Sequence, residues 1–160
     1  MKINSRLSSV LHALLHMAEH EGPMSSETLS HCLGTNPVVV RRTLGLLRDA
    51  GIVSADRGHS GGWRISADLA AISLRRLHEI LGESEFFAIG HRSQNPSCLV
   101  EQAVNAALGQ ALADAQALLN ARFESISLAD LAADFARRHA EVKAGRPTGS
   151  NTAIAPPKPQ

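Results

Sequence analysis

The stretch from Thr35 to Ser66 (TNPVVVRRTLGLLRDAGIVSADRGHSGGWRIS) constrains the fold more than any other part of the chain. Asn36 is a good helix N-cap, and Pro37 fits the first helical position, where its missing N–H costs nothing. The apolar residues that follow recur at spacings of four and three, which predicts one buried helix face: Val40, Leu44 and Leu47. Four residues fall on the other side of the helix: Val38, Arg41, Arg42 and Gly45.

After this helix the sequence predicts a two-stranded hairpin. Gly51 fits a left-handed helix end, and Ile52 to Asp56 is a short strand. The segment from Arg57 to Gly62 contains three glycines and can reverse the chain, and Trp63 to Ser66 returns as the second strand. A helix with arginines on its free face before such a hairpin is typical of a winged helix. The helix would enter a DNA major groove, and the wing would touch the backbone or the minor groove.

Composition and charge agree with a cytoplasmic DNA-binding protein. The 160 residues are 44% hydrophobic, without a secretory signal or an apolar run long enough to span a membrane, and the two cysteines lack framework spacing. The formal net charge is +1. Five arginines against two aspartates make the segment 34–66 +3, whereas five basic against eight acidic residues make the segment 83–144 −3. A basic patch on an acidic body suits a DNA reader, although a solvated helix face explains it as well.

The rest of the chain is predicted to be mainly helical, in four parts. Helices over 6–20, 27–33 and 74–81 complete a winged helix-turn-helix domain over residues 1–82, and 83–97 is a linker loop. Residues 98–141 form dimerisation helices, and 142–160 a disordered tail. The linker holds an apolar cluster that suits either an effector pocket or a packed hinge, made of Phe86, Phe87 and Ile89.

The long helix, from Cys98 to Phe123, is expected to pair with a second copy. Its apolar residues are assigned to one stripe, which a body of this size cannot cover: Leu99, Ala103, Ala106, Leu112, Ala115 and Leu119. Behind it, Ser127 and Asp130 resemble a capping box, which predicts a further helix to about Ala140.

These residues resemble the Rrf2 family of bacterial winged-helix transcription regulators. The resemblance is carried by TNPVVVRRTLGLLRDAGIV, by RGHSGGW, by the opening MKINSRLSSVLHALLHMA and by SLADL, over roughly residues 1–135. NPVVVRR looks most like the YwnA-like branch, which lacks an iron–sulfur cluster. The resemblance implies a homodimer that binds an imperfect palindrome in double-stranded DNA, with a recognition helix over 36–50 and a wing over 57–63. We expect a repressor. Trp63 stands where the family has Tyr.

No cofactor is expected. Cluster-binding members of the family use three cysteines between the fourth helix and the long helix, and here Cys98 alone matches one of those positions. A cluster needs about four ligands, mostly thiolates, and His91 and Glu101 do not make up the difference.

Two further groups of residues have a functional and an ordinary interpretation. Cys98, at a helix start where the dipole favours thiolate, suits a redox sensor or a packed core residue. Cys32 is more typical of a core residue, with sensing as the alternative. His12, His16 and His20 recur every four residues, a spacing that can share a metal, but we expect them to lie on a solvated face.

The leading hypothesis is therefore a homodimeric, cytoplasmic transcription regulator that is redox- or stress-responsive. Its predicted DNA contacts are Asn36, Val38, Val39, Arg41, Arg42, Arg57, His59, Ser60 and Arg64. The alternative is a winged helix that docks on proteins and does not bind specific DNA. An enzyme is not expected, because nucleophile, phosphate-loop and zinc-protease motifs are missing from the sequence.

Overall fold

The computed structural model describes residues 5–56, 58, 61–82 and 98–144. The fold is mainly helical with a two-stranded antiparallel sheet, which confirms the predicted fold class. The elements follow in the order α1 (Ser5–Glu19), α2 (Ser26–Leu33), α3 (Pro37–Asp49), β1 (Val53–Ala55), β2 (Trp63–Ile65), the 3-10 helix η1 (Leu69–Ala71), α4 (Leu74–Ile80), α5 (Leu99–Glu124) and α6 (Leu128–Lys143).

Helices α2, α3 and α4 begin where the local chemistry indicated. Ser25, Asn36 and Ser73 accept backbone N–H groups as the N-caps of α2, α3 and α4. Beyond α3, Gly51 is in the left-handed conformation with φ of +76°, as expected from its position. The short helix η1 was not predicted, because its three residues carry no periodic pattern. Strands β1 and β2 are each three residues, shorter than expected.

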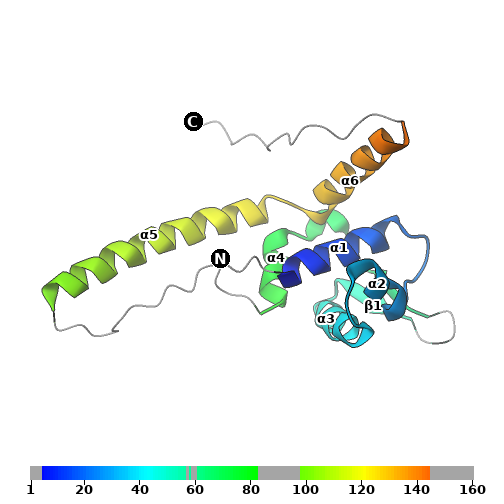
Figure 1. Ribbon diagram of the computed structural model, residues 1–160, viewed down its shortest axis with the longest axis horizontal. Helices are drawn as coiled ribbons and strands as arrows, with labels where there is room; N and C mark the ends of the chain where they lie inside the picture. Colours follow the sequence, from blue (N-terminus) through cyan, green and yellow to red (C-terminus); the bar gives the residue numbers. More distant parts are fainter. Residues whose placement is uncertain (1–4, 57, 59–60, 83–97, 145–160) are drawn as a thin grey trace.

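Helices α1, α2 and α3 gather at one end of the molecule beside the hairpin, and α5 projects away from them (Figure 1). One buried cluster joins these elements. Leu14, Leu29, Leu44 and Leu47 are at its centre and fully buried. The predicted core face of α3 is confirmed, because Val40, Leu44 and Leu47 all belong to this cluster.

The hairpin is attached to the helical body through the turn before α2. Val53 pairs with Ile65 and Ala55 with Trp63, while Met24 forms a bridge with Trp63 from the other side. The Met24 and Trp63 amides exchange hydrogen bonds of 2.9 and 2.8 Å. The Trp63 ring is buried, and its Nε1 donates to Ser26 Oγ at 2.9 Å, so the aromatic residue packs under the wing.

The two C-terminal helices are fixed to the domain at one joint. Ser73 and Ser127 form a bridge, and the Leu128 amide donates to Ile72 O at 2.8 Å. The Leu128 side chain is fully buried in the winged-helix core. The capping box is confirmed, because Ser127 Oγ accepts the Asp130 amide while the Asp130 carboxylate accepts the Ser127 amide. Hydrogen bonds from Ser127 hold the pKa of the Asp130 carboxyl below its usual value.

The predicted apolar stripe of α5 was wrong as a single face. Leu112 and Leu119 lie roughly 200° around the helix from Leu99, and both are half-buried. Of the large apolar residues that α5 leaves exposed, Val100, Val104, Leu108 and Leu118 lie on one side of the helix, and Leu99 lies about 100° around the helix from Val100. The error arose because α5 is rich in Ala and Leu on several sides. No residue of α5 is buried.

Among the described residues, no helix combines the length and the apolar character needed to cross a membrane.

A substitution at Gly62 tests the contact between the hairpin and the Met24 backbone. A Cβ on Gly62 would lie 2.7 Å from the Met24 carbonyl carbon and oxygen, so Gly62→Ala must displace backbone. We expect it to lower the free energy of unfolding by about 1–3 kcal/mol. Gly45→Ala meets no atom within 4 Å, and removing a glycine from a helix interior should stabilise by about 0.5–1 kcal/mol. Urea unfolding of both variants measures the difference; equal stabilities would refute this account of the wing.

Candidate nucleic-acid interface

The free face of α3 is exposed, and its two arginines, Arg41 and Arg42, have no charged partner among the described residues. The Val38 and Val39 side chains are 62% and 53% exposed, and Arg41 and Arg42 are exposed beside them. Within the described part of the chain, neither guanidinium of Arg41 and Arg42 makes a hydrogen bond or an ion pair. The buried face of the same helix fixes their direction, because its leucines lock the helix against the core.

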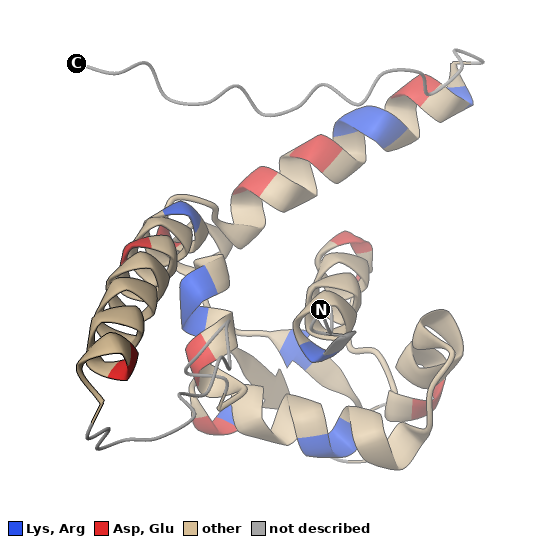
Figure 2. Ribbon diagram, turned by 60° about the vertical axis from the view of Figure 1, so that its left-hand side comes forward, with Lys and Arg blue, Asp and Glu red and all other residues tan. Residues whose placement is uncertain are grey.

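The arginines of α6, in contrast, form ion pairs within their own helix. Arg137 pairs with Asp134 and with Glu141, and Arg138 Nε donates to Asp134 at 2.6 Å. These contacts, first with Arg138 and then with Arg137, hold the pKa of the Asp134 carboxyl below its usual value. Acidic and basic residues are interspersed along this helix (Figure 2). The charges of α6 are thus compensated locally, whereas those of Arg41 and Arg42 remain available to an anionic partner.

The other predicted DNA contacts fall into three groups. Asn36 is engaged in the fold, since its Oδ1 accepts the Val38 amide at 2.8 Å as the cap of α3. Arg64 on β2 is exposed and lies 3.6 Å from Asp56 across the hairpin. Arg57, His59 and Ser60 lie outside the described residues. Their contacts with DNA stay predictions.

Behind α3 there is a hollow that the sequence did not indicate. It has a volume of about 460 Å³ and lies between α1 and α3, with apolar walls that include Val10 and Leu33. Arg6 and Arg42 lie at its edge. Its lining residues come from three helices, and no spacing in the sequence predicts that they lie close together. The predicted effector cluster at 86, 87 and 89 lies outside the described residues.

Cys98 is exposed at the N-cap of α5, where a thiolate is favoured. The backbone N–H groups of Glu101 and, second, Val100 hold the pKa of the Cys98 thiol below its ordinary value, although the thiol makes no capping hydrogen bond of good geometry. Cys32 was expected in the core, but it is exposed on the outer side of α2. Both cysteines are free thiols.

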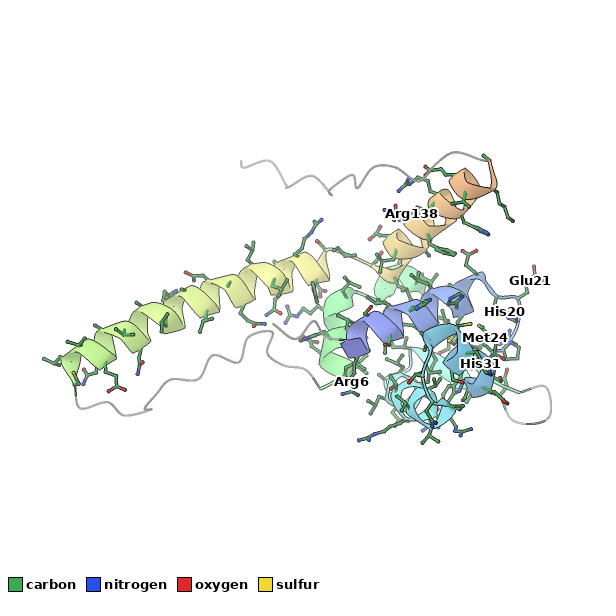
Figure 3. All side chains as sticks on the ribbon, viewed as in Figure 1. Arg6, His20, Glu21, Met24, His31 and Arg138 are labelled. Atoms are coloured by element: carbon green, nitrogen blue, oxygen red, sulfur yellow. The ribbon has the colours of Figure 1, made fainter. Side chains whose placement is uncertain are left out.

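The three histidines of the first helix do not form one group. His12 and His16 come together, with 3.0 Å between their Nε2 atoms. His20 lies beyond the end of α1, near Glu21 (Figure 3), and its Nδ1 is 3.4 Å from Gly22 O. In the described ranges, no three His, Cys, Asp or Glu side chains come close enough to hold a metal together.

The residues present do not fit an iron–sulfur cluster. The chain has two cysteines, one on α2 and one at the start of α5, and a cluster needs about four ligands that are mostly thiolates. Among the described residues, neither exposed thiol belongs to a group of three metal-binding side chains.

A small helical core that carries a hairpin and, beside it, a helix whose exposed arginines have no partner among the described residues is typical of the winged helix-turn-helix proteins that bind DNA. Comparison with known proteins agrees. The family model Rrf2, described as an iron-dependent transcriptional regulator, matches residues 3–134. The chain therefore belongs to the Rrf2 family.

Individual relatives point the same way. YwnA of Bacillus subtilis (strain 168), named as a candidate HTH-type transcriptional regulator, is 34% identical over 130 residues, covering 81% of this chain and 96% of YwnA. A candidate transcriptional regulator from Lactobacillus plantarum has a TM-score of 0.71 at 21% identity, covering 89% of this chain and 97% of its own. A structure described as a candidate DNA-binding protein has a TM-score of 0.59 at 30% identity, covering 79% and 97%. The family is described as one of transcriptional regulators, and none of these relatives is described as an enzyme.

The state of the Cys98 thiol can be measured directly. In a Cys32→Ser variant, which leaves one thiol, the rate of alkylation by iodoacetamide should rise with pH as thiolate forms. Because the pKa of Cys98 is lowered, we expect the midpoint of that profile below the midpoint measured for N-acetylcysteine amide, a reference thiol without a carboxylate, under the same conditions. Mass spectrometry gives the rates. A midpoint at or above that of the reference thiol would show that the α5 amides do not act on Cys98.

Proposed function

We propose that the protein is a homodimeric, sequence-specific DNA-binding repressor of the Rrf2 family, without an iron–sulfur cluster. The observation that carries the proposal is the free face of α3. Two valines and two arginines without partners in the described part of the chain stand on a helix whose other face is locked in the core. Arginine suits the acceptor edge of guanine, and the valine methyl groups suit the thymine methyl group.

The hairpin gives the second DNA contact in this proposal. Arg64 lies on β2, and the sequence of the turn contains Arg57, His59 and Ser60. Contacts from a wing meet phosphates or the minor groove, where little sequence information is read. The helix therefore provides specificity and the wing provides affinity that depends strongly on salt.

The dimer in this proposal forms through α5. The helix runs for 26 residues, none of them buried, and it leaves a line of large apolar side chains exposed. Val104 and Leu108 are 49% and 46% exposed in the middle of that line. Pairing two copies of α5 covers these side chains and places two α3 helices on one duplex, as an imperfect palindrome requires.

A response to oxidants, if it is present, acts through Cys98 in this proposal. The thiol is exposed, its pKa is lowered, and it stands at the start of the helix that pairs the two copies. Oxidation there would add a charge or a bond beside the dimer helix and alter the spacing between half-sites, to which binding is sensitive.

One experiment tests the function as a whole. The purified full chain is incubated with sheared genomic DNA of its source, with and without hydrogen peroxide, and the bound fragments are sequenced. We expect recovery of a few sites that share an imperfect palindrome, with occupancy that falls steeply as salt rises. Recovery of no common site at low salt would favour the alternative, in which the winged helix docks on proteins.

The arginines of α3 are tested on a recovered site. Changing Arg41 or Arg42 to Ala should weaken operator binding by about 1–3 kcal/mol where the side chain reads a base, and relax preference at one base pair. Arg138→Ala removes an arginine that is paired within α6, so it serves as the matched control and should leave binding unchanged. Fluorescence anisotropy measures the affinities. Operator affinity unchanged in both α3 variants, with the circular dichroism spectrum intact, contradicts the assignment.

The dimer is tested with charges on two sides of α5. Val104→Asp with Leu108→Asp should give monomers that lose operator binding, because one half-site supplies too little affinity. Ala106→Asp with Ala113→Asp places the same two charges on exposed positions roughly on the opposite side, and should leave the dimer intact. Sedimentation velocity measures the mass. The assignment fails if the wild type is monomeric at micromolar concentration, or if both pairs have the same effect.

A further inference from the structure

His12 and His16 on α1 belong neither to the proposed DNA contacts nor to the proposed dimer face, and they are not near either thiol in sequence. His12 and His16 stand one turn apart on the side of α1 that is turned away from the core cluster; His12 is exposed and His16 half-buried. Their Nε2 atoms are 3.0 Å apart, while the ring centroids are 4.8 Å apart and the ring planes differ by 29°. The edges that carry Nε2 are therefore closer than the ring centres, so the two nitrogens converge.

This separation is close to the one that a chelated transition metal needs. Two metal–nitrogen bonds of about 2.0–2.1 Å place their nitrogens about 2.9 Å apart when they meet at a right angle and about 3.3 Å apart at the tetrahedral angle. Neutral imidazole is a good ligand for Zn²⁺, Cu²⁺ and Ni²⁺, and residues at i and i+4 of a helix present both rings to the same ion.

We propose that His12 and His16 form a two-histidine site for one divalent transition-metal ion, with water molecules at the remaining positions. A third protein ligand is not part of the site, because no group of three metal-binding side chains occurs among the described residues. His20, the next in the series, lies beyond the helix end against Gly22 O.

A hydrogen bond between the two rings would give the same 3.0 Å separation without any metal. The metal site and the hydrogen-bonded pair predict different responses to an added ion. A pair of histidines that does not chelate the ion is not stabilised by it. Binding of an ion to the folded state stabilises the fold by mass action. The ion would close one turn of α1, whose inner face carries Val10, Leu14 and Met17 in the core. Melting temperature is therefore a second readout.

The test uses the full chain without a purification tag, in a Cys32→Ser, Cys98→Ser background so that thiols do not take up the metal. Titration calorimetry with Zn²⁺ and with Ni²⁺ should give one ion per chain. We expect His12→Ala and His16→Ala each to weaken binding at least tenfold, and His20→Ala to leave it unchanged. Zn²⁺ should raise the melting temperature of the background protein but not that of His12→Ala.

Three results would overturn the proposal: no binding of either ion in the background protein, equal binding in the His12→Ala, His16→Ala double variant, or a loss in His20→Ala as large as in His16→Ala. Both histidines project from the outer side of the helix, so circular dichroism should show all the variants folded. An unfolded His12→Ala is replaced by His12→Gln, which keeps a polar side chain of similar length.

Discussion

Everything that faces outward on α3 depends on the packing of its inner face. Val40, Leu44 and Leu47 enter the same buried cluster as Leu14 of α1 and Leu29 of α2. Leu44 and Leu47 are essentially inaccessible to water, and each buried leucine contributes about 1.5–3 kcal/mol. This packing sets the rotation of the helix about its axis. Arg41 and Arg42 then make no hydrogen bond or ion pair within the described part of the chain and are exposed to solvent, where a polyanion can approach them.

The hairpin depends on a second contact, between the backbones of residue 24 and residues 62 and 63. The N–H groups of Met24 and Trp63 each donate to the carbonyl oxygen of the other residue, which fixes the turn before α2 beside β2 through an isolated bridge. Gly62 sits so close to Met24 that any side chain would strike the carbonyl group. The wing is thus held on the side of the body where α2 begins, at a fixed position relative to α3.

The sequence was a good guide to elements held by local chemistry. The caps at Asn36, Ser73 and Ser127, the core face of α3 and the left-handed Gly51 follow from residue type and spacing, and the structure has them. It was a poor guide to α5 and Cys32. In an Ala- and Leu-rich helix several faces are apolar, so periodicity does not tell which one the body covers. Whether a cysteine on a short helix is buried depends on neighbours distant in sequence.

The features of the candidate site likewise fall into those that the sequence predicts and those that only the structure shows. The arginines of α3 could be named from periodicity, because the face opposite three core residues must be free. The hollow between α1 and α3, the approach of Gly62 to Met24 and the joint at Leu128 could not, since each joins segments far apart in the chain. The pairing of His12 and His16 was predictable in part. The spacing indicated that three histidines could lie together, and the structure brings only His12 and His16 close to each other.

The place of Trp63 has an optical consequence. The chain has one tryptophan and no tyrosine, so its near-ultraviolet-excited emission comes almost wholly from that indole. The ring is buried under the hairpin, and its N–H is bonded to Ser26 at the start of α2. A shift of the wing relative to α2 would expose the ring to water and move the emission to longer wavelength. The protein therefore carries its own fluorescent reporter of wing position, with no label needed.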